Sequence, residues 1–207
     1  MPQVALLVIA KQPLAGRVKT RLTPPLAPAQ AASLAGAALR DTIDAVARTP
    51  ASRRVLVFDG CADQWRPPGF EVIAQRGDDL GQRLQAAFDD VDGPALLVGM
   101  DTPQLTAPML HDAARAVANP LVDAVLGPTL DGGYWCVGFR KPVADAFRGV
   151  PMSREDTYAR QRQRFAQLRL RVGEQPLLRD VDTIADARSV AATAPQTRFA
   201  RTLATMA

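Results

Sequence analysis

The chain has 207 residues, of which 47% are hydrophobic and 22% charged, and its formal net charge is +4. This length and composition are typical of a globular protein with a buried core, and they exclude a disulfide scaffold or a long disordered chain. We therefore expect a single domain over residues 1–207, with its core at about residues 3–190.

Two cysteines and one histidine limit the chemistry that the side chains can support. Cys61, Cys136 and His111 form no CxxC motif and no histidine cluster, so neither a zinc site nor a Cys–His catalytic pair is expected. Isolated cysteines fit a reducing compartment. The apolar run at 4–10 is too short for a transmembrane span or a signal peptide. We therefore expect a cytoplasmic protein without a membrane span.

Much of the positive charge lies at residues 160–171, which hold five arginines and no acidic residue. A nucleic-acid interface normally interleaves aromatic side chains with its cations. Only Phe165 interleaves here. The pattern therefore favours a solvated helix face, and we expect no nucleic-acid partner.

Apolar runs and helical periodicity divide the chain into alternating strands and helices. In chain order, they predict a strand at 4–10, a cationic loop at 11–26, a helix at 28–48, strands at 54–60 and 70–75, and a helix at 77–91. Next come a strand at 94–100, a helix at 107–118, strands at 122–128 and 133–139, and helical segments at 143–148 and 154–168. A loop at 179–183, a helix at 183–192 and a frayed last dozen residues complete the chain.

This alternation predicts an α/β protein with a mostly parallel sheet that helices cover on both faces. Ligands of such sheets bind beyond the carboxyl ends of the strands. Asp101, the loop at 11–22 and the Asp-Gly-Gly-Tyr turn at 131–134 all follow predicted strands. We therefore expect them to gather along one edge of the sheet.

The loop after the first strand carries four cations, Lys11, Arg17, Lys19 and Arg21, together with Gly16. Glycine allows close backbone approach to an anion, and lysine and arginine neutralise phosphate charge. The loop therefore predicts a phosphate site, and the alternative is a mobile solvated loop. The segment lacks the glycine that precedes the lysine of a P-loop, and no GxGxxG motif occurs.

Three aspartates form the second candidate group: Asp101, and Asp180 with Asp182 near the end of the chain. Residues two apart in an extended segment project to the same face. Carboxylates without histidine or cysteine suit Mg²⁺ or Mn²⁺. The alternative is separate capping, with Asp182 before the helix at Thr183 and Asp101 in a turn with Thr102.

The segment GPTLDGGYW at 127–135 forms the third group. Adjacent glycines allow either close contact with a ligand or a simple hairpin turn. Tyr134 and Trp135 are candidates for stacking on a base or for packing in the core, and core packing is favoured for Trp135.

Taken together, these motifs resemble a bacterial family of GT-A-like proteins in the nucleotide-diphospho-sugar transferase superfamily, related to 2-phospholactate guanylyltransferase and molybdenum cofactor guanylyltransferase. The motifs that carry the resemblance are VKTRL (18–22), GDDLGQR (77–83), GMDTPQL (99–105), GPTLDGGYW (127–135) and DVDT (180–183). Many relatives have Trp-Ser where this chain has Met152-Ser153. The first loop also differs from the GxGTRL form of sugar-nucleotide pyrophosphorylases.

The resemblance implies a three-layer α/β/α sandwich with a Rossmann-like, mostly parallel sheet. It also implies a site whose residues have four roles. Nucleotide binding is expected of Lys11, Gly16, Lys19, Arg21, Gln75, Gly81 and Arg83. Acceptor binding is expected of Gly132, Gly133, Tyr134 and Ser153, and metal binding of Asp101, Asp180 and Asp182. Lys19, Arg21 and Asp101 are the expected catalytic residues.

Three functions fit this reading. The first is metal-dependent transfer of a nucleoside monophosphate from an NTP, with GTP favoured, to a small phosphorylated acceptor with release of pyrophosphate. The second is glycosyl transfer from a nucleotide sugar, and the third is a non-catalytic nucleotide-binding module. Asp-Thr-Pro at 101–103, in place of the Asp-x-Asp of many glycosyltransferases, favours the first. Since dimers are common among soluble enzymes, a homodimer is one expectation.

Overall fold

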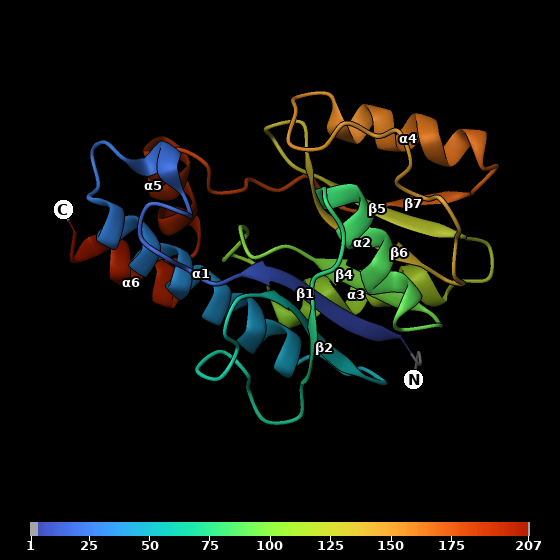
Figure 1. Cartoon of the computed structure of the whole chain (residues 1–207), viewed down its shortest axis with the longest axis horizontal. Helices are drawn as coiled ribbons and strands as arrows, with labels where there is room; N and C mark the ends of the chain where they lie inside the picture. Colours follow the sequence, from blue (N-terminus) through green and yellow to red (C-terminus); the bar gives the residue numbers. More distant parts are fainter. Residues whose placement is uncertain (1–3, 207) are drawn as a thin grey trace.

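The computed structural model describes residues 4–206, and its strands form one seven-stranded sheet in the order β3-β2-β1-β4-β6-β5-β7 (Figure 1). The strands are β1 (Ala5–Lys11), β2 (Arg54–Asp59), β3 (Glu71–Ala74), β4 (Ala95–Val98), β5 (Ala124–Pro128), β6 (Tyr134–Phe139) and β7 (Val172–Glu174). Strand β6 runs antiparallel to its neighbours β4 and β5, and the other neighbouring pairs are parallel.

Helices cover both faces of this sheet, which confirms the predicted α/β class and its layered architecture. The helices are η1 (Thr20–Leu22), α1 (Pro28–Ala47), α2 (Leu80–Asp89), α3 (Ala107–Ala118), α4 (Thr157–Gln167), α5 (Ile184–Thr193) and α6 (Arg198–Ala204). Side chains of α1 and α3 share one core cluster with the sheet, whereas those of α2 and α4 belong to a second cluster.

Strand β1 contributes side chains to the hydrophobic clusters on both faces of the sheet. Successive side chains of a strand point to opposite faces of the sheet. Leu6 and Val8 accordingly join the cluster beneath α1 and α3, while Ala5 and Leu7 join the cluster beneath α2 and α4. A strand buried on both faces must be apolar throughout, which is why residues 4–10 form a continuous apolar run.

A third cluster lies beside the sheet, where α5 and α6 pack against the N-terminal half of α1 (Figure 1). Leu34 of α1, Val190 of α5 and Phe199 are buried there together with Val181. The carboxylate of Asp41 in α1 accepts hydrogen bonds from the backbone N–H groups of Arg198 and Phe199, at 3.0 and 2.8 Å. Helix α6 is therefore fixed at its first turn by a residue far away in the sequence.

Some local predictions are wrong. Residues 143–148 form turns and not a helix, because Asp145 adopts a positive φ of 57°. The last dozen residues do not fray as a whole, since α6 is folded there. The short strand β7 has no counterpart among the predicted elements.

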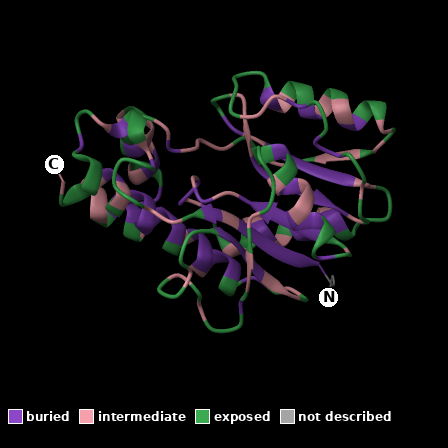
Figure 2. Cartoon of the chain, in the orientation of Figure 1, coloured by how far each residue is buried: buried purple, intermediate pink, exposed green. Residues whose placement is uncertain are grey.

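The distribution of burial follows the layers. The strands at the centre of the sheet are buried, and the outer surfaces of the helices are exposed (Figure 2). Of the five arginines at 160–171, three belong to α4, where Arg160 pairs with Asp156 and Arg162 with Glu174. The other two follow the helix, and Arg171 pairs with Asp123. Between residues 4 and 206, no helix combines the length and the apolar character that crossing a membrane requires.

Candidate active site

A cavity of about 1240 Å³ opens at the edge of the sheet where β1 ends and where the chain leaves β4 and β5. Seven acidic and five basic side chains line it. They come from the end of β1 and the first loop, the residues after β4, the β5–β6 turn, the segment at 153–156 and the segment at 179–186. The volume suits a nucleotide together with a second small molecule, given that ligand pockets usually measure about 300–1,000 Å³.

Asp101 is held at this edge by the backbone of a distant segment. The N–H group of Val181 donates a hydrogen bond to the carbonyl oxygen of Asp101 at 2.9 Å. Thr102, which follows, is only 2% exposed, whereas the side chain of Asp101 is 48% exposed. The carboxylate of Asp101 therefore points into the cavity, whereas Thr102 is buried.

The segment carrying Asp180 and Asp182 leads directly into α5. Thr183 caps that helix by accepting the N–H of Asp186 at 3.2 Å, and Asp186 accepts the N–H of Thr183 at 3.0 Å in return. Because Thr183 provides the cap, the alternative reading of Asp182 as a helix cap is wrong. The carboxylate of Asp182 instead pairs with Arg21.

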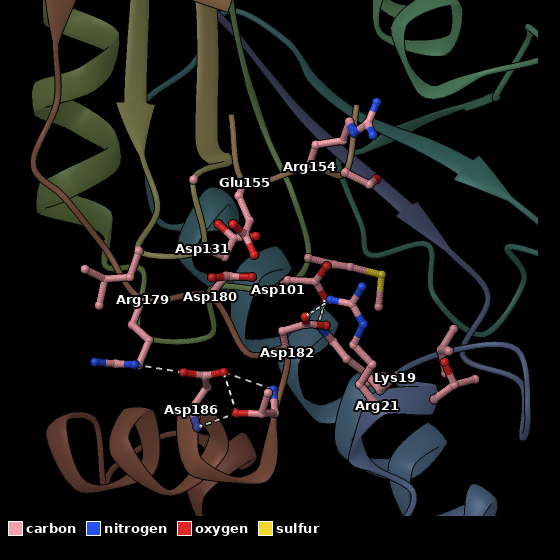
Figure 3. A pocket seen from close by; sticks show the side chains of 18 of the residues that line it. Lys19, Arg21, Asp101, Asp131, Arg154, Glu155, Arg179, Asp180, Asp182 and Asp186 are labelled. Atoms are coloured by element: carbon pink, nitrogen blue, oxygen red, sulfur yellow. Dashed lines mark hydrogen bonds and ion pairs between the residues drawn. The ribbon is translucent and has the colours of Figure 1, made fainter. Parts of the chain in front are cut away.

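The first loop brings its cations directly to these acids (Figure 3). Lys19 adopts a left-handed conformation (φ 49°, ψ 40°) just before η1. Its ammonium contacts a carboxylate oxygen of Asp101 at 2.7 Å and donates a hydrogen bond to the carbonyl of Val181. The Lys19 side chain is 10% exposed and that of Arg21 is 73% exposed. The cation of the first ion pair is therefore buried, whereas the cation of the second lies at the surface.

The turn between β5 and β6 adds a further acid. One oxygen of the Asp131 carboxylate accepts hydrogen bonds from the Thr129 hydroxyl at 2.6 Å and from the Gly133 N–H at 2.9 Å. The turn is tied to the start of α4, which directly follows the segment at 153–156, because the N–H of Tyr158 donates to the carbonyl of Gly132 at 2.8 Å. The turn and this segment therefore form one continuous wall of the cavity.

The acids in the cavity influence one another. Burial raises the pKa of Asp180 to about 6, and the negative charges of Asp131 and Asp101 act in the same direction, while the Lys19 ammonium opposes them. Figure 3 shows the carboxylates of Asp131, Asp180 and Asp101 facing a common space. This mutual repulsion favours the entry of a cation.

The structure brings many of the predicted site residues together. Those that line the cavity are Lys11, Lys19, Arg21, Asp101, Gly132, Ser153, Asp180 and Asp182. Those that do not line it are Gly16, Gln75, Gly81, Arg83, Gly133 and Tyr134. Arg17, the remaining cation of the first loop, also lies outside the lining.

Gln75 and Arg83 form a separate small network near the ends of β1 and β2. The Gln75 amide donates to the carbonyls of Ala10 and Val57 at 2.7 and 3.3 Å. Arg83 contacts the Gln75 side-chain oxygen at 3.3 Å. These residues therefore support the strand ends beside the cavity.

Tyr134 and Trp135, the two aromatic residues at the start of β6, pack against other residues of the protein. Trp135 is 3% exposed, and its indole N–H donates to the carbonyl of Pro176 at 2.9 Å, which confirms the core reading. The hydroxyl of Tyr134 lies 3.6 Å from the sulfur of Met152, and burial raises the pKa of Tyr134 far above its usual value. Neither side chain is in a position to stack on a base in the cavity.

Sequence reasoning did not identify several residues of the cavity, namely Asp131, Arg154, Glu155, Asp156, Arg179 and Asp186. Asp131 belongs to an Asp-Gly-Gly sequence that is also typical of an ordinary hairpin turn, so the sequence alone does not assign it to the site. Arg179 pairs with Asp186 at 2.8 Å, and Arg154 forms no ion pair within the described residues 4–206.

The chemistry of the lining fits a hard divalent cation, because its acidic groups are all carboxylates. The arrangement is not a ready coordination shell, however. Within the described part of the chain, no three acidic, histidine or cysteine side chains stand close enough together to hold a metal ion. The carboxylates of Asp101 and Asp182 instead pair with cations of the first loop.

Comparisons with known proteins agree with this fold. The sequence profile of the family DUF2064, described as an uncharacterized protein conserved in bacteria, matches residues 42–154. No curated protein matches the chain. A crystal structure from Desulfovibrio desulfuricans G20, provisionally described as a nucleotide-diphospho-sugar transferase, is 30% identical with a TM-score of 0.87, over 98% of this chain and 94% of that one.

Two more distant structures share the fold alone. CMP:2-keto-3-deoxy-manno-octonic acid synthetase complexed with CTP is 12% identical, with a TM-score of 0.63 over 93% of this chain and 99% of that one. Rv0371c from Mycobacterium tuberculosis H37Rv, solved in complex with manganese, is 20% identical, with a TM-score of 0.52 over 91% and 97%. The chain therefore belongs to the DUF2064 family of bacterial proteins and has the fold of the nucleotide-diphospho-sugar transferases.

Proposed function

We propose that this protein is a metal-dependent nucleotidyltransferase, which transfers a nucleoside monophosphate from an NTP to a small phosphorylated acceptor. The observation that carries the proposal is the convergence of three distant parts of the chain on one cavity. The cations Lys11, Lys19 and Arg21 face the acids Asp101 and Asp180 there. A polyanionic ligand that arrives with a divalent cation complements both sets of charges.

In this reaction an oxygen of the acceptor phosphate attacks the α-phosphorus of the NTP. The bond between the α-phosphorus and the bridging oxygen breaks, and pyrophosphate leaves. An acceptor phosphate that is already ionised needs no general base. This suits a site without histidine, since His111 lies on α3 and does not line the cavity.

Lys11, Lys19 and Arg21 would hold the phosphate groups and stabilise the departing pyrophosphate. Asp101, Asp180 and Asp182 would hold Mg²⁺ or Mn²⁺, and the bound ion would polarise phosphate oxygens. Most of the catalytic effect would come from positioning and charge neutralisation, as in other phosphoryl-group transfers.

The opposite wall of the cavity, which contains Gly132 and Ser153, would face the acceptor. Arg154 lies on this wall without an ion-pair partner among residues 4–206. Its guanidinium would suit a phosphorylated acceptor, because arginine binds phosphate through two parallel hydrogen bonds.

The relatives support nucleotide chemistry. The 30% identical protein is provisionally described as a nucleotide-diphospho-sugar transferase, and two proteins of the same fold were solved with CTP and with manganese. Guanine as the preferred base rests on the resemblance to guanylyltransferases alone.

Glycosyl transfer from a nucleotide sugar is the second candidate, and the provisional description of the 30% identical relative favours it. The residues after β4 favour nucleotidyl transfer. Thr102 and Pro103 are both buried, so no second carboxylate accompanies Asp101 at this position.

The test is to incubate the protein with Mg²⁺, each of the four common NTPs and a panel of phosphorylated acceptors, and to measure pyrophosphate. Release of pyrophosphate that depends on both acceptor and metal supports the proposal. Release of a nucleoside diphosphate from a nucleotide sugar would establish the second candidate instead. Binding of Mg·NTP by calorimetry without turnover on either panel would indicate a non-catalytic module.

A further inference from the structure

Two of the three acids proposed to hold a metal, Asp101 and Asp182, are paired with cations of the same loop. Lys19 pairs with Asp101, and Arg21 pairs with Asp182. The same two cations are those expected to bind the phosphates of a nucleotide. In the proposed function these cations therefore have two competing partners, the carboxylates of the protein and the phosphates of the nucleotide.

Lys19 is the more buried of these two cations. Its ammonium lies between the Asp101 carboxylate, at 2.7 Å, and the Val181 carbonyl, and its side chain is only 10% exposed. Its backbone is held in a left-handed conformation at the start of η1, where Leu22 is fully buried. Arg21 is 73% exposed, so water and salt weaken its pair.

A metal ion and an ammonium compete for the oxygen lone pairs of one carboxylate. While Lys19 contacts Asp101, a divalent cation at Asp101 would also lie next to a positive charge of the protein. A triphosphate changes this balance, because it offers Lys19 an alternative partner with more negative charge.

We propose that Lys19 closes the metal position at Asp101 in the free protein, and that a triphosphate opens it by drawing the ammonium away. Metal and nucleotide then bind as one complex, and each increases the affinity for the other. This inference rests on the proposed nucleotide function and specifies the form in which the substrate enters, namely the metal–triphosphate complex.

The test measures Mn²⁺ binding to the full-length protein without nucleotide, by the EPR signal of the free ion. Lys19→Met removes the ammonium and keeps the length of the side chain. We expect it to bind Mn²⁺ about tenfold more tightly than the wild type, which is within the usual range of coupling between sites.

The matched control is Lys11→Met. Lys11 lines the same cavity but forms no ion pair with residues 4–206. The Lys11→Met variant measures the effect of removing any positive charge from the cavity. We expect it to gain much less Mn²⁺ affinity than Lys19→Met does. Lys19→Gln serves as a second variant if the methionine variant fails to fold, because glutamine also lacks the positive charge but keeps a hydrogen-bond donor for the Val181 carbonyl.

Adding a GTP analogue with a methylene group between the α- and β-phosphorus completes the test. The analogue should tighten Mn²⁺ binding by the wild type strongly and by the Lys19 variants little. Equal Mn²⁺ affinity in the Lys19 and Lys11 variants, or no Mn²⁺ binding by any of the proteins, would overturn the inference. A failure of the proposed function is distinguishable, because it appears as absence of pyrophosphate release while the Mn²⁺ titrations still show the difference.

Discussion

The carbonyl oxygen of Glu155 lies 1.8 Å from the position that a β-carbon on Gly132 would occupy. Gly132 also has a positive φ of 87°, which disfavours any residue with a side chain. The tight turn after β5 and the segment at 153–156 can therefore approach each other only because position 132 is glycine. This contact shapes the wall of the cavity that carries Ser153 and Arg154.

Gly132→Ala should lower the free energy of unfolding by about 1–3 kcal/mol, because the new methyl group meets backbone and the φ angle is strained. It should also displace the segment at 153–156 and raise the KM for the acceptor. Urea unfolding and steady-state kinetics would measure the two effects. Gly133→Ala is the control, since its β-carbon would meet only side-chain oxygens, those of Asp131 and Thr129, at 3.1 Å. Similar losses in both variants would contradict the role assigned to Gly132.

Asp101→Asn should reduce metal-dependent turnover by about 100-fold, because it removes a charged metal ligand and keeps the size of the side chain. The fold should remain, since the side chain is 48% exposed at the edge of the sheet. Turnover at limiting Mg²⁺ and the thermal midpoint would be measured together. Asp156→Asn provides the comparison, because Asp156 lines the same cavity but pairs with Arg160 on the outer helix α4. Wild-type turnover by the Asp101 variant at limiting Mg²⁺ would remove Asp101 from the mechanism.

Lys19→Ala should weaken the binding of a nucleoside triphosphate far more than the binding of the corresponding nucleoside. The physical reason is that the ammonium of Lys19 neutralises phosphate charge and has no assigned contact with the base. Calorimetric titration of wild type and variant with both ligands would measure the difference. Equal losses for the two ligands would show that Lys19 acts through the structure of the loop.

The stability of the metal-free protein should depend on the ionisation of Asp180. Its pKa is about 6 in the folded chain, compared with an ordinary value of 3.8. The folded chain therefore holds this proton more tightly than the unfolded chain does. The resulting stabilisation is fully present below pH 3.8 and is lost as the pH rises through about 6.

Asp180→Asn removes this dependence. Relative to the wild type, the variant should gain stability between about pH 4 and pH 6 and keep a constant advantage at higher pH. Urea midpoints of both proteins across this range, in buffer with a chelator, would measure the effect. A difference between the proteins that does not change with pH would mean that Asp180 ionises at its ordinary pKa.

The sequence was sufficient to predict the architecture wherever burial on both faces imposes continuous apolar runs, as in β1 and β4. It could not give the direction of β6, because an apolar run has no polarity. The helix predicted at 143–148 failed because Ala146 and Phe147 are buried within turns, so their apolar character does not report helical structure. Helix α6 was missed because its first turn is held by Asp41, a contact that depends on the folded chain.

The candidate site was predictable where chemistry is concentrated in short motifs, as with Lys19, Arg21 and Asp101. Asp131 was not assigned, because its role in the hairpin turn explains the sequence equally well. The pairing of Asp101 and Asp182 with cations of the first loop could not be foreseen either, since each pair joins residues that lie far apart in the sequence.

The hydrogen bond between Val181 and Asp101 ties the candidate active site to a part of the chain that lies beyond the last strand. Once translation has produced Glu174, the chain contains all seven strands and the loop with Lys19 and Arg21. It still lacks Asp180 and Asp182, as well as the backbone groups of Val181 that contact Asp101 and Lys19. A polypeptide that ended at Glu174 would therefore contain every strand of the sheet and the cations of the first loop, but would lack two of the three aspartates proposed to hold a metal.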